Sequence, residues 1–123
     1  MTDAIAVYVT TADASEARNI GRQLIKERLA ACANISDGMH SIYHWEGKLC
    51  EDTESVLLLK TRRELLERLT TRIRQLHSYS CPCIVAFPVI GGNAEYLVWI
   101  DRETDNALQP PSPESSARKT SEK

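Results

Sequence analysis

The 123-residue sequence has little excess charge of either sign and no long apolar run. A formal net charge of −2 gives no electrostatic basis for binding nucleic acid or an anionic membrane. No window approaches the ~20 apolar residues of a membrane-spanning helix. The start, "MTDAIAVYVTTAD", has neither the basic end nor the long apolar core of a signal peptide. These absences predict a cytoplasmic protein without nucleic-acid or membrane partners.

Disulfide bonds are not expected either. The sequence has four cysteines, Cys32, Cys50, Cys81 and Cys83. A chain without a secretory signal keeps its cysteines as thiols in a reducing compartment. Cys32 lies in the apolar stretch "AACANI" and is expected in the core. Cys50 lies beside a charged turn and is expected to be the most exposed of the four.

The first half of the sequence carries strand, helix and strand signals in turn. Residues 4–10, "AIAVYVT", suit a strand buried on both faces. Asp13 and Glu16 form a capping box for a helix over about residues 14–30, in which apolar residues recur at helical spacing. A long strand then runs from "CANI" through "SIYHWEG", bent at "SDG" (36–38). Its alternation places Tyr43 and Trp45 on one face.

The second half repeats this pattern. The charged "EGKLCED" predicts a hairpin tip, and the run "VLLL" in the return strand "TESVLLLKT" predicts cover on both faces. "TRRE" predicts a capping box, with Thr61 as N-cap and Glu64 at N3, for a helix that ends near His77. Residues 83–90 follow as a strand whose Pro88 belongs at a sheet edge or a bulge.

The order β-α-β-β-α-β, with a short closing helix capped by Asn93, predicts an α+β, ferredoxin-like fold. The antiparallel sheet then has both long helices on one face. We expect residues 1–104 to form this domain and residues 105–123, rich in Pro, Ser and charge, to be a disordered tail. The second sheet face carries apolar residues with no helix left to cover it, which indicates burial against other subunits.

Several blocks of the sequence resemble the CutA divalent-cation-tolerance proteins in order and spacing. They are "AACANI", "SIYHWEGKL", "ESVLLLKT", the H-x-Y-x-x-P segment starting at His77, and "YLVWI". The resemblance runs from about residue 5 to residue 103. It implies a ferredoxin-like protomer in a tight homotrimer, similar in architecture to the PII signalling proteins. It also implies a link to tolerance of copper and other divalent metals, with no established enzymatic reaction.

The resemblance carries over to individual positions only in part. The family's loop His, Tyr and second Pro, its Lys-Thr pair, and its late Tyr and Trp correspond to His77, Tyr79, Pro82, Lys60, Thr61, Tyr96 and Trp99. The first Pro of the loop is replaced by Ser78, and the Glu after its second Pro is replaced by Cys83. Two of the three ligands proposed for copper-binding bacterial members are replaced by Thr10 and Leu76. That ligand set therefore cannot be transferred.

The segment "HSYSCPC", residues 77–83, is the candidate metal site. Thiolates are strong ligands of soft metals, and imidazole is a borderline one. His77, Cys81 and Cys83 could therefore hold Cu(I), which accepts two or three ligands. Zinc would need a fourth ligand from water or a neighbouring subunit. The alternative interpretation is structural, with Cys81 following a turn and Cys83 packed under the sheet.

Six further residues are predicted at a subunit interface or in a ligand cleft: Tyr43, Trp45, Lys60, Tyr79, Tyr96 and Trp99. Large side chains with one polar tip suit interfaces and cores, and stacking on a ligand is the alternative. Lys60 precedes a predicted helix start, a place that attracts an anion or a glutamate of a neighbouring subunit.

The predicted function is that of a non-enzymatic homotrimer of divalent-metal tolerance, with copper or another divalent cation as the bound metal. The alternative is a PII-like sensor that holds a small molecule in clefts between subunits, although the sequence has no Walker or Rossmann glycine-rich loop. A cysteine enzyme with His77 as base lacks an orienting third residue. An RNA-binding module lacks exposed aromatics on its third strand.

Overall fold

The computed structural model describes residues 2–105. Its elements follow the predicted order: β1 (Ala4–Thr11), α1 (Ala14–Lys26), β2 (Cys32–Trp45), β3 (Lys48–Arg62), the short 3-10 helix η1 (Arg63–Leu65), α2 (Leu66–Leu76), β4 (Ile84–Pro88) and α3 (Ala94–Arg102). Except for Asp105, the predicted tail lies outside the described residues. Within residues 2–105, no helix is long and apolar enough to cross a membrane.

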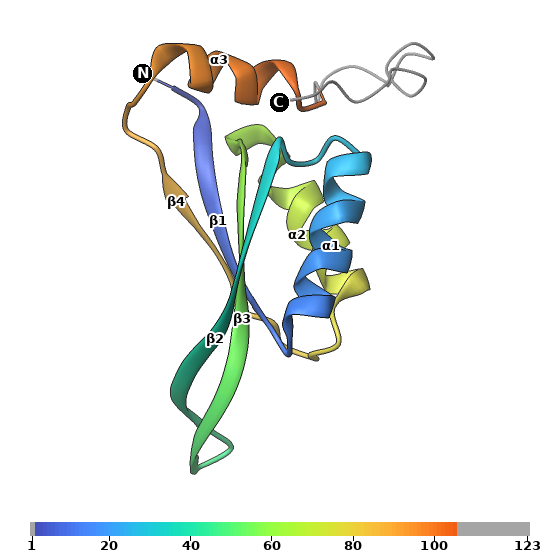
Figure 1. Cartoon of the computed structure of the whole chain (residues 1–123), viewed down its shortest axis with the longest axis vertical. Helices are drawn as coiled ribbons and strands as arrows, with labels where there is room; N and C mark the ends of the chain where they lie inside the picture. Colours follow the sequence, from blue (N-terminus) through green and yellow to red (C-terminus); the bar gives the residue numbers. More distant parts are fainter. Residues whose placement is uncertain (1, 106–123) are drawn as a thin grey trace.

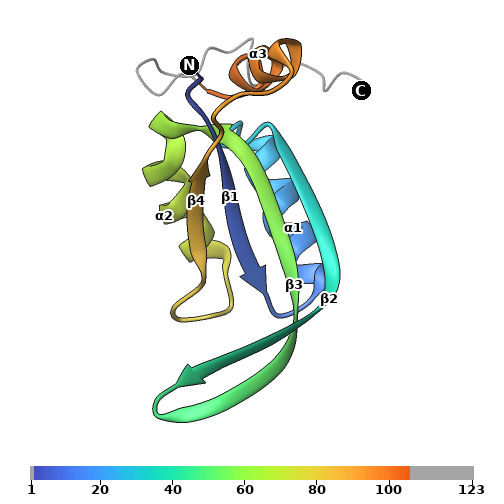
Figure 2. The ribbon, with the colours of Figure 1, turned by 90° about the vertical axis from the view of Figure 1, so that its left-hand side faces the viewer.

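The four strands form one antiparallel sheet in the order β2-β3-β1-β4. Both α1 and α2 lie on one face of this sheet (Figure 1). Figure 2 looks onto the opposite face, which neither of these helices covers. We call it the open face; its residues include Tyr8, Thr10, Leu58, Lys60, Val85 and Phe87. The predicted ferredoxin-like arrangement is confirmed, with Pro88 at the end of the edge strand β4.

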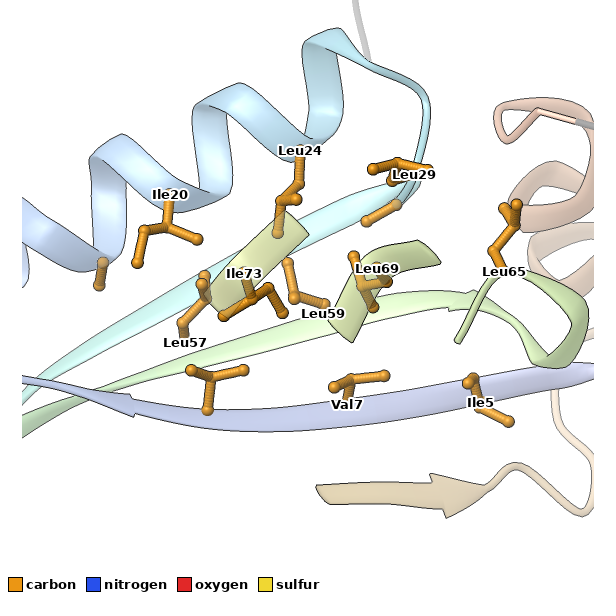
Figure 3. Packing of buried hydrophobic residues seen from close by; sticks show 13 residues of the cluster. Ile5, Val7, Ile20, Leu24, Leu29, Leu57, Leu59, Leu65, Leu69 and Ile73 are labelled. Carbon is orange, nitrogen blue, oxygen red and sulfur yellow. The ribbon is translucent and has the colours of Figure 1, made fainter. Parts of the chain in front are cut away.

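The core lies between the sheet and these two helices. Alternate residues of β1 and β3 meet aliphatic residues at helical spacing on α1 and α2 (Figure 3). Fully buried side chains include Val7, Leu57 and Leu59 from the strands and Leu24, Leu69 and Ile73 from the helices. Burial of each large aliphatic side chain contributes about 1.5–3 kcal/mol. This layer is therefore the main source of stability in the domain.

Helix α1 begins after its Asp13 cap, as predicted, but ends at Lys26 rather than at residue 30. Arg28 adopts a φ of 62°, which takes the chain out of the helical region. The Leu29 N–H then donates back to Leu24 O at 3.0 Å, a bond of the Schellman motif that ends helices. An arginine occupies the position where glycine is usual, so no local sequence signal marks this end.

The predicted capping box at residues 61–64 is wrong. Thr61 belongs to β3 and is fully buried, and its hydroxyl donates to Leu29 O at 2.7 Å. Glu64 instead pairs with the guanidinium of Arg62, and α2 begins after η1 without a side-chain cap. Because side chains alternate along a strand, Thr61 points into the core and is not available to the helix.

The β2–β3 hairpin is tighter at its tip than predicted. Its turn consists of Glu46 and Gly47, with φ angles of 51° and 81°, and strand pairing resumes on both sides. Positive φ at both positions is the geometry of a two-residue type I′ hairpin turn. The predicted bend at residues 36–38 is confirmed by a shift of register between Ser36 and Met39.

Helix α3 lies across one end of the sheet (Figure 1). Asn93 caps its first turn, as predicted. Arg28 pairs with Glu103 at 2.9 Å, and the Arg62 Nε–H donates to Thr104 Oγ1 at 2.8 Å. These contacts from the loop after α1 and from the end of β3 fix α3 against the domain.

Candidate functional site

The open face is apolar at its centre. In the sheet register, Tyr8 of β1 lies between Leu58 of β3 and Val85 of β4. Val85 and Phe87 are 45% and 53% exposed, which are large fractions for apolar strand residues. In the "VLLL" run only Leu57 and Leu59, which face the helices, are buried. Residues 2–105 alone therefore do not supply the predicted cover on both faces.

His77 follows the last residue of α2 and is bound on both sides of its ring. Its side chain is fully buried, with Nε2 2.7 Å from Thr10 O and Nδ1 3.0 Å from the backbone nitrogen of Tyr79. The Thr10 carbonyl can only accept and the Tyr79 N–H can only donate. The ring is therefore the neutral tautomer with its proton on Nε2. Both ring nitrogens are used within the chain.

Glu16 joins the start of α1 to the 77–83 segment. Its Oε1 accepts the Ala12 N–H at 3.0 Å, and its Oε2 accepts the Ser78 N–H at 2.7 Å. Oε2 also lies 3.8 Å from His77 Nδ1. Burial by itself would raise the pKa of Glu16, but the hydrogen bonds from Ala12 and Ser78 outweigh it and hold the pKa below its ordinary value. The predicted cap thus also anchors the candidate metal segment.

Tyr79 links the same segment to the open face. Its hydroxyl donates to Glu54 Oε2 at 2.8 Å, and Glu54 is only 8% exposed. Burial, and next the bond to Glu54, raise the pKa of Tyr79 above the ordinary tyrosine range. Because Glu54 shares its face of β3 with Leu58, its carboxylate lies on the open face beside the 77–83 segment.

Cys81 and Cys83 are free thiols, and both residues are exposed. Burial of the sulfur and then the charge of Glu54 raise the pKa of Cys83. A nucleophilic cysteine needs a lowered pKa. The raised pKa of Cys83 therefore does not favour Cys83 as the nucleophile of a cysteine enzyme.

Of the predicted metal set, the structure leaves Cys81 and Cys83 as free thiols on exposed residues and gives His77 other partners. Among residues 2–105, no group of three or more histidine, cysteine, aspartate or glutamate side chains is placed to hold a metal ion. His77 can become a ligand only by giving up its bond to Thr10 or to Tyr79. The ligand set of His77, Cys81 and Cys83 stays a prediction.

Lys60 lies at the other end of the open face. Its Nζ donates to Asn34 Oδ1 at 2.7 Å and lies 5.9 Å from the ring centroid of Tyr96. Tyr96 stacks on Trp99 with ring centroids 5.4 Å apart. Burial and then a hydrogen bond with Cys32 raise the pKa of Tyr96. Cys32 is therefore a half-buried residue of the open face, and its predicted core position is wrong.

Tyr43 and Trp45 lie far out on the β2–β3 hairpin and are 38% and 49% exposed. The Tyr43 hydroxyl donates to Asp52, and this bond raises the pKa of Tyr43 to about 12. Cys50, which pairs with Tyr43 in the register, is half-buried, so the expectation that it is the most exposed cysteine is wrong. The interface or cleft role of the two aromatic residues stays a prediction.

Sequence reasoning missed two acids of this site. The sequence pattern at Glu16 predicts only a helix cap, and Glu54 is not among the predicted site residues. One signal for Glu54 is available, because it precedes Val56 by two positions and so shares a strand face with Val56 and Leu58. An acidic residue at the end of an otherwise apolar strand face indicates that its carboxylate has a polar partner.

Comparison with known proteins identifies a family that this chain resembles over most of its length. The family described as "CutA1 divalent ion tolerance protein" matches residues 5–103. The chain is similar to the "Divalent-cation tolerance protein CutA" of Thermus thermophilus, at 45% identity over 98 residues, which are 80% of this chain and 95% of that protein. It is also similar to "Protein CutA, chloroplastic" of Arabidopsis thaliana, at 41% identity over 102 residues and 83% of this chain. It covers 56% of that plant protein, so it spans about half the length of the plant relative.

Solved structures agree. The crystal structure of CutA1 from Oryza sativa matches with a TM-score of 0.84 and 40% identity, covering 86% of this chain and 97% of that one. The relatives do not share one compartment, since one is described as chloroplastic in Arabidopsis thaliana and another as periplasmic in Archaeoglobus fulgidus. Because both sequence and fold match over nearly the whole described domain, the chain belongs to the CutA1 divalent ion tolerance family.

Proposed function

We propose that this chain acts in tolerance of divalent metals as a cytoplasmic homotrimer that binds copper and catalyses no reaction. Membership of the family supports the link to divalent ions. The observation that carries the proposal is the pair of free, exposed thiols at Cys81 and Cys83. Thiolates are the side chains that bind soft metal ions most strongly.

The open face supports the assembly. Val85 and Phe87 at its centre are about half exposed, and Tyr43 and Trp45, which the register places on the same face of the hairpin, are 38% and 49% exposed. A stable interface buries about 800 Å² on each partner, and a contiguous apolar face without a covering helix provides a surface of that kind. In this proposal the aromatic residues of the hairpin, Tyr43 and Trp45, contact neighbouring subunits.

The metal site is the 77–83 segment, with Cys81 and Cys83 as sulfur ligands. Two hydrogen bonds fix the start of the segment to the rest of the domain. The Ser78 N–H donates to Glu16, and the Tyr79 hydroxyl donates to Glu54. Ligands on a supported segment need less ordering when a metal binds. His77 completes the predicted set only after it releases one of its two hydrogen bonds.

Native mass spectrometry of the purified, reduced protein tests assembly and metal binding together. We expect the mass of three chains, and copper that is retained in Cys50→Ser but lost in Cys81→Ser/Cys83→Ser. Cys50→Ser is the matched control because it removes a half-buried thiol that belongs to β3 and not to the segment. A well-folded single chain at micromolar concentration would refute the trimer. Equal copper binding by the two variants would refute the site.

A second candidate function is a PII-like sensor that holds an anionic small molecule at Lys60. The ammonium group lies between Asn34 and the ring of Tyr96, and Tyr96 and Trp99 stack on each other. A cation beside a stacked aromatic pair suits an anion with a flat ring. Thermal-shift screening of wild type and Lys60→Gln against nucleotides and anionic metabolites tests this role. A stabilising compound should lose its effect in Lys60→Gln, and a flat screen would exclude the role.

A further inference from the structure

A thiol and an ammonium group lie side by side on the open face, at the other end from the 77–83 segment. Cys32 is a free, half-buried thiol on the edge strand β2, and the register places Lys60 of β3 directly opposite it. Directly opposite residues of an antiparallel pair point to the same face, with Cβ atoms about 4.5–5.5 Å apart. The two side chains are therefore neighbours on one surface.

One amide oxygen joins the thiol to the ammonium group. Asn34 Oδ1 accepts the Cys32 thiol at 3.6 Å and a proton of Lys60 Nζ at 2.7 Å. Tyr96 of α3 completes the cluster, because its hydroxyl is hydrogen-bonded with Cys32 and its ring centroid lies 5.9 Å from Lys60 Nζ. The sulfur thus lies beside one cation and two neutral polar groups, and none of these three partners is a carboxylate.

Cys50 and Cys83 have different surroundings. Cys50 lies opposite Tyr43 rather than opposite a cation. Burial and then the charge of Glu54 raise the pKa of Cys83. Reactive cysteines are typically partly exposed and lie in electropositive surroundings beside cationic side chains. Of these three thiols, Cys32 is the one that faces a lysine across the strands.

Lys60 gives this surface a preference for anions. An ammonium group has three N–H donors, and Asn34 accepts one of them. The group can therefore bond a carboxylate on an incoming molecule without releasing Asn34. At a partly exposed site such a charge pair changes an affinity by up to about 5-fold. A small anion that carries a sulfur atom would bring that sulfur to the Cys32 thiol.

We propose that Cys32 is a modification site that forms a mixed disulfide with an anionic small-molecule disulfide, and that Lys60 binds a carboxylate of that molecule. The Cys32 thiolate attacks one sulfur of the small disulfide, and a new S–S bond forms as the old one breaks. The other half leaves as a thiolate and takes up the proton that Cys32 released. The small disulfide is itself the oxidant, so the step needs no further reactant. This site lies outside the proposed metal segment and shares only Lys60 and its neighbours with the second candidate function.

Reaction of the reduced, assembled full chain with glutathione disulfide tests the site, and mass mapping of peptides locates the added group. We expect addition at Cys32 that is about 3–5-fold slower in Lys60→Gln and near the wild-type rate in Lys60→Arg, because arginine keeps the charge. The uncharged disulfide of mercaptoethanol is the matched probe, and it should react equally fast with wild type and Lys60→Gln. Cys81→Ser/Cys83→Ser should react at Cys32 as wild type does.

Three results would overturn this inference. Addition mainly at Cys81 or Cys83 would show that exposure alone decides which thiol reacts. Equal rates for wild type and Lys60→Gln with glutathione disulfide would remove Lys60 as the partner of the anion. A Cys32 thiol that reacts only after unfolding would show that neighbouring subunits cover it.

Copper binding separates this inference from the proposed function. Cys32→Ser should lose the mixed disulfide and still bind copper as wild type does, because the two sites share no residue. If Cys32→Ser loses copper, Cys32 belongs to the metal site and the inference fails. If copper binds through Cys81 and Cys83 but glutathione disulfide does not add to Cys32, the inference fails and the proposed function stands.

Discussion

Removing one hydroxyl group tests the contact that holds the 77–83 segment to the open face. In Tyr79→Phe the ring remains, but the donor to Glu54 Oε2 at 2.8 Å is lost. Hydrogen bonds to charged groups contribute about 1.5–3 kcal/mol. Water can partly replace the lost donor because Tyr79 is only half-buried. We therefore expect the free energy of unfolding to fall by about 1.5–2 kcal/mol, near the lower end of that range.

Urea unfolding at a fixed chain concentration, followed by circular dichroism, measures this loss. A double-mutant cycle with Glu54→Gln isolates the pair, because glutamine keeps the shape of the side chain. We expect a coupling energy of about 1 kcal/mol or more. Tyr43→Phe is the matched control, since it removes an equivalent bond to Asp52 on the exposed hairpin and should cost less. A Tyr79→Phe variant as stable as wild type, or a cycle without coupling, would show that this contact does not hold the segment.

The same substitution predicts a change in alkaline stability. The fold raises the pKa of Tyr79, so it favours the protonated hydroxyl over the tyrosinate. The stabilisation is then fully present below the unfolded-state pKa of about 10 and is lost as pH rises toward the folded-state value. Above pH ~10 the free energy of unfolding should therefore fall more steeply in wild type than in Tyr79→Phe. Equal slopes in urea unfolding between pH ~9 and pH ~11 would contradict the assigned environment.

Three further substitutions test single features of the fold. Thr61→Ser should lower the free energy of unfolding by about 1 kcal/mol through loss of a buried methyl group, whereas serine at an N-cap would be neutral; thermal unfolding distinguishes these results. Glu16→Gln should flatten the acid side of the stability curve. The lowered pKa of Glu16 gives stability that is present above pH ~4.5 and lost as pH falls through the folded-state pKa, so an unchanged acid transition would exclude that contribution. Gly47→Val, at a φ of 81°, should destabilise the hairpin by at least about 1–2 kcal/mol. Hydrogen exchange should show faster hairpin amides in Gly47→Val than in Gly47→Asn, and equal rates would exclude turn strain.

The order of elements could be predicted because its signals are local. Helical spacing in α1 and α2, and the caps at Asp13 and Asn93, act within a few residues. Thr61 shows where such signals fail, since "TRRE" has the letters of a cap but β3 continues through Thr61 and buries it. The end of α1 was missed for a related reason, because Arg28 takes a conformation that glycine normally marks.

The candidate site could be predicted by composition but not by its contacts. One histidine and two cysteines within seven residues predict a candidate metal site at residues 77–83. The partner of the His77 Nε2–H is the backbone carbonyl of a residue 67 positions away in the sequence. Every residue has a backbone carbonyl, so the residue type at that position gives no sign of this hydrogen bond. Glu54 and Tyr79, 25 residues apart, meet only because β3 and the loop after α2 reach the same end of the sheet.

The β2–β3 hairpin extends past the ends of both helices that cover the sheet (Figure 1). Beyond its shift of register, this arm is a ribbon of two strands, and a lone ribbon of that kind is only marginally stable in water. The arm should therefore be the last part of the chain to become ordered during folding and the first to exchange its amide protons. In the proposed trimer, neighbouring subunits would cover the arm, so its order would depend on the concentration of chains, whereas the core between sheet and helices would not.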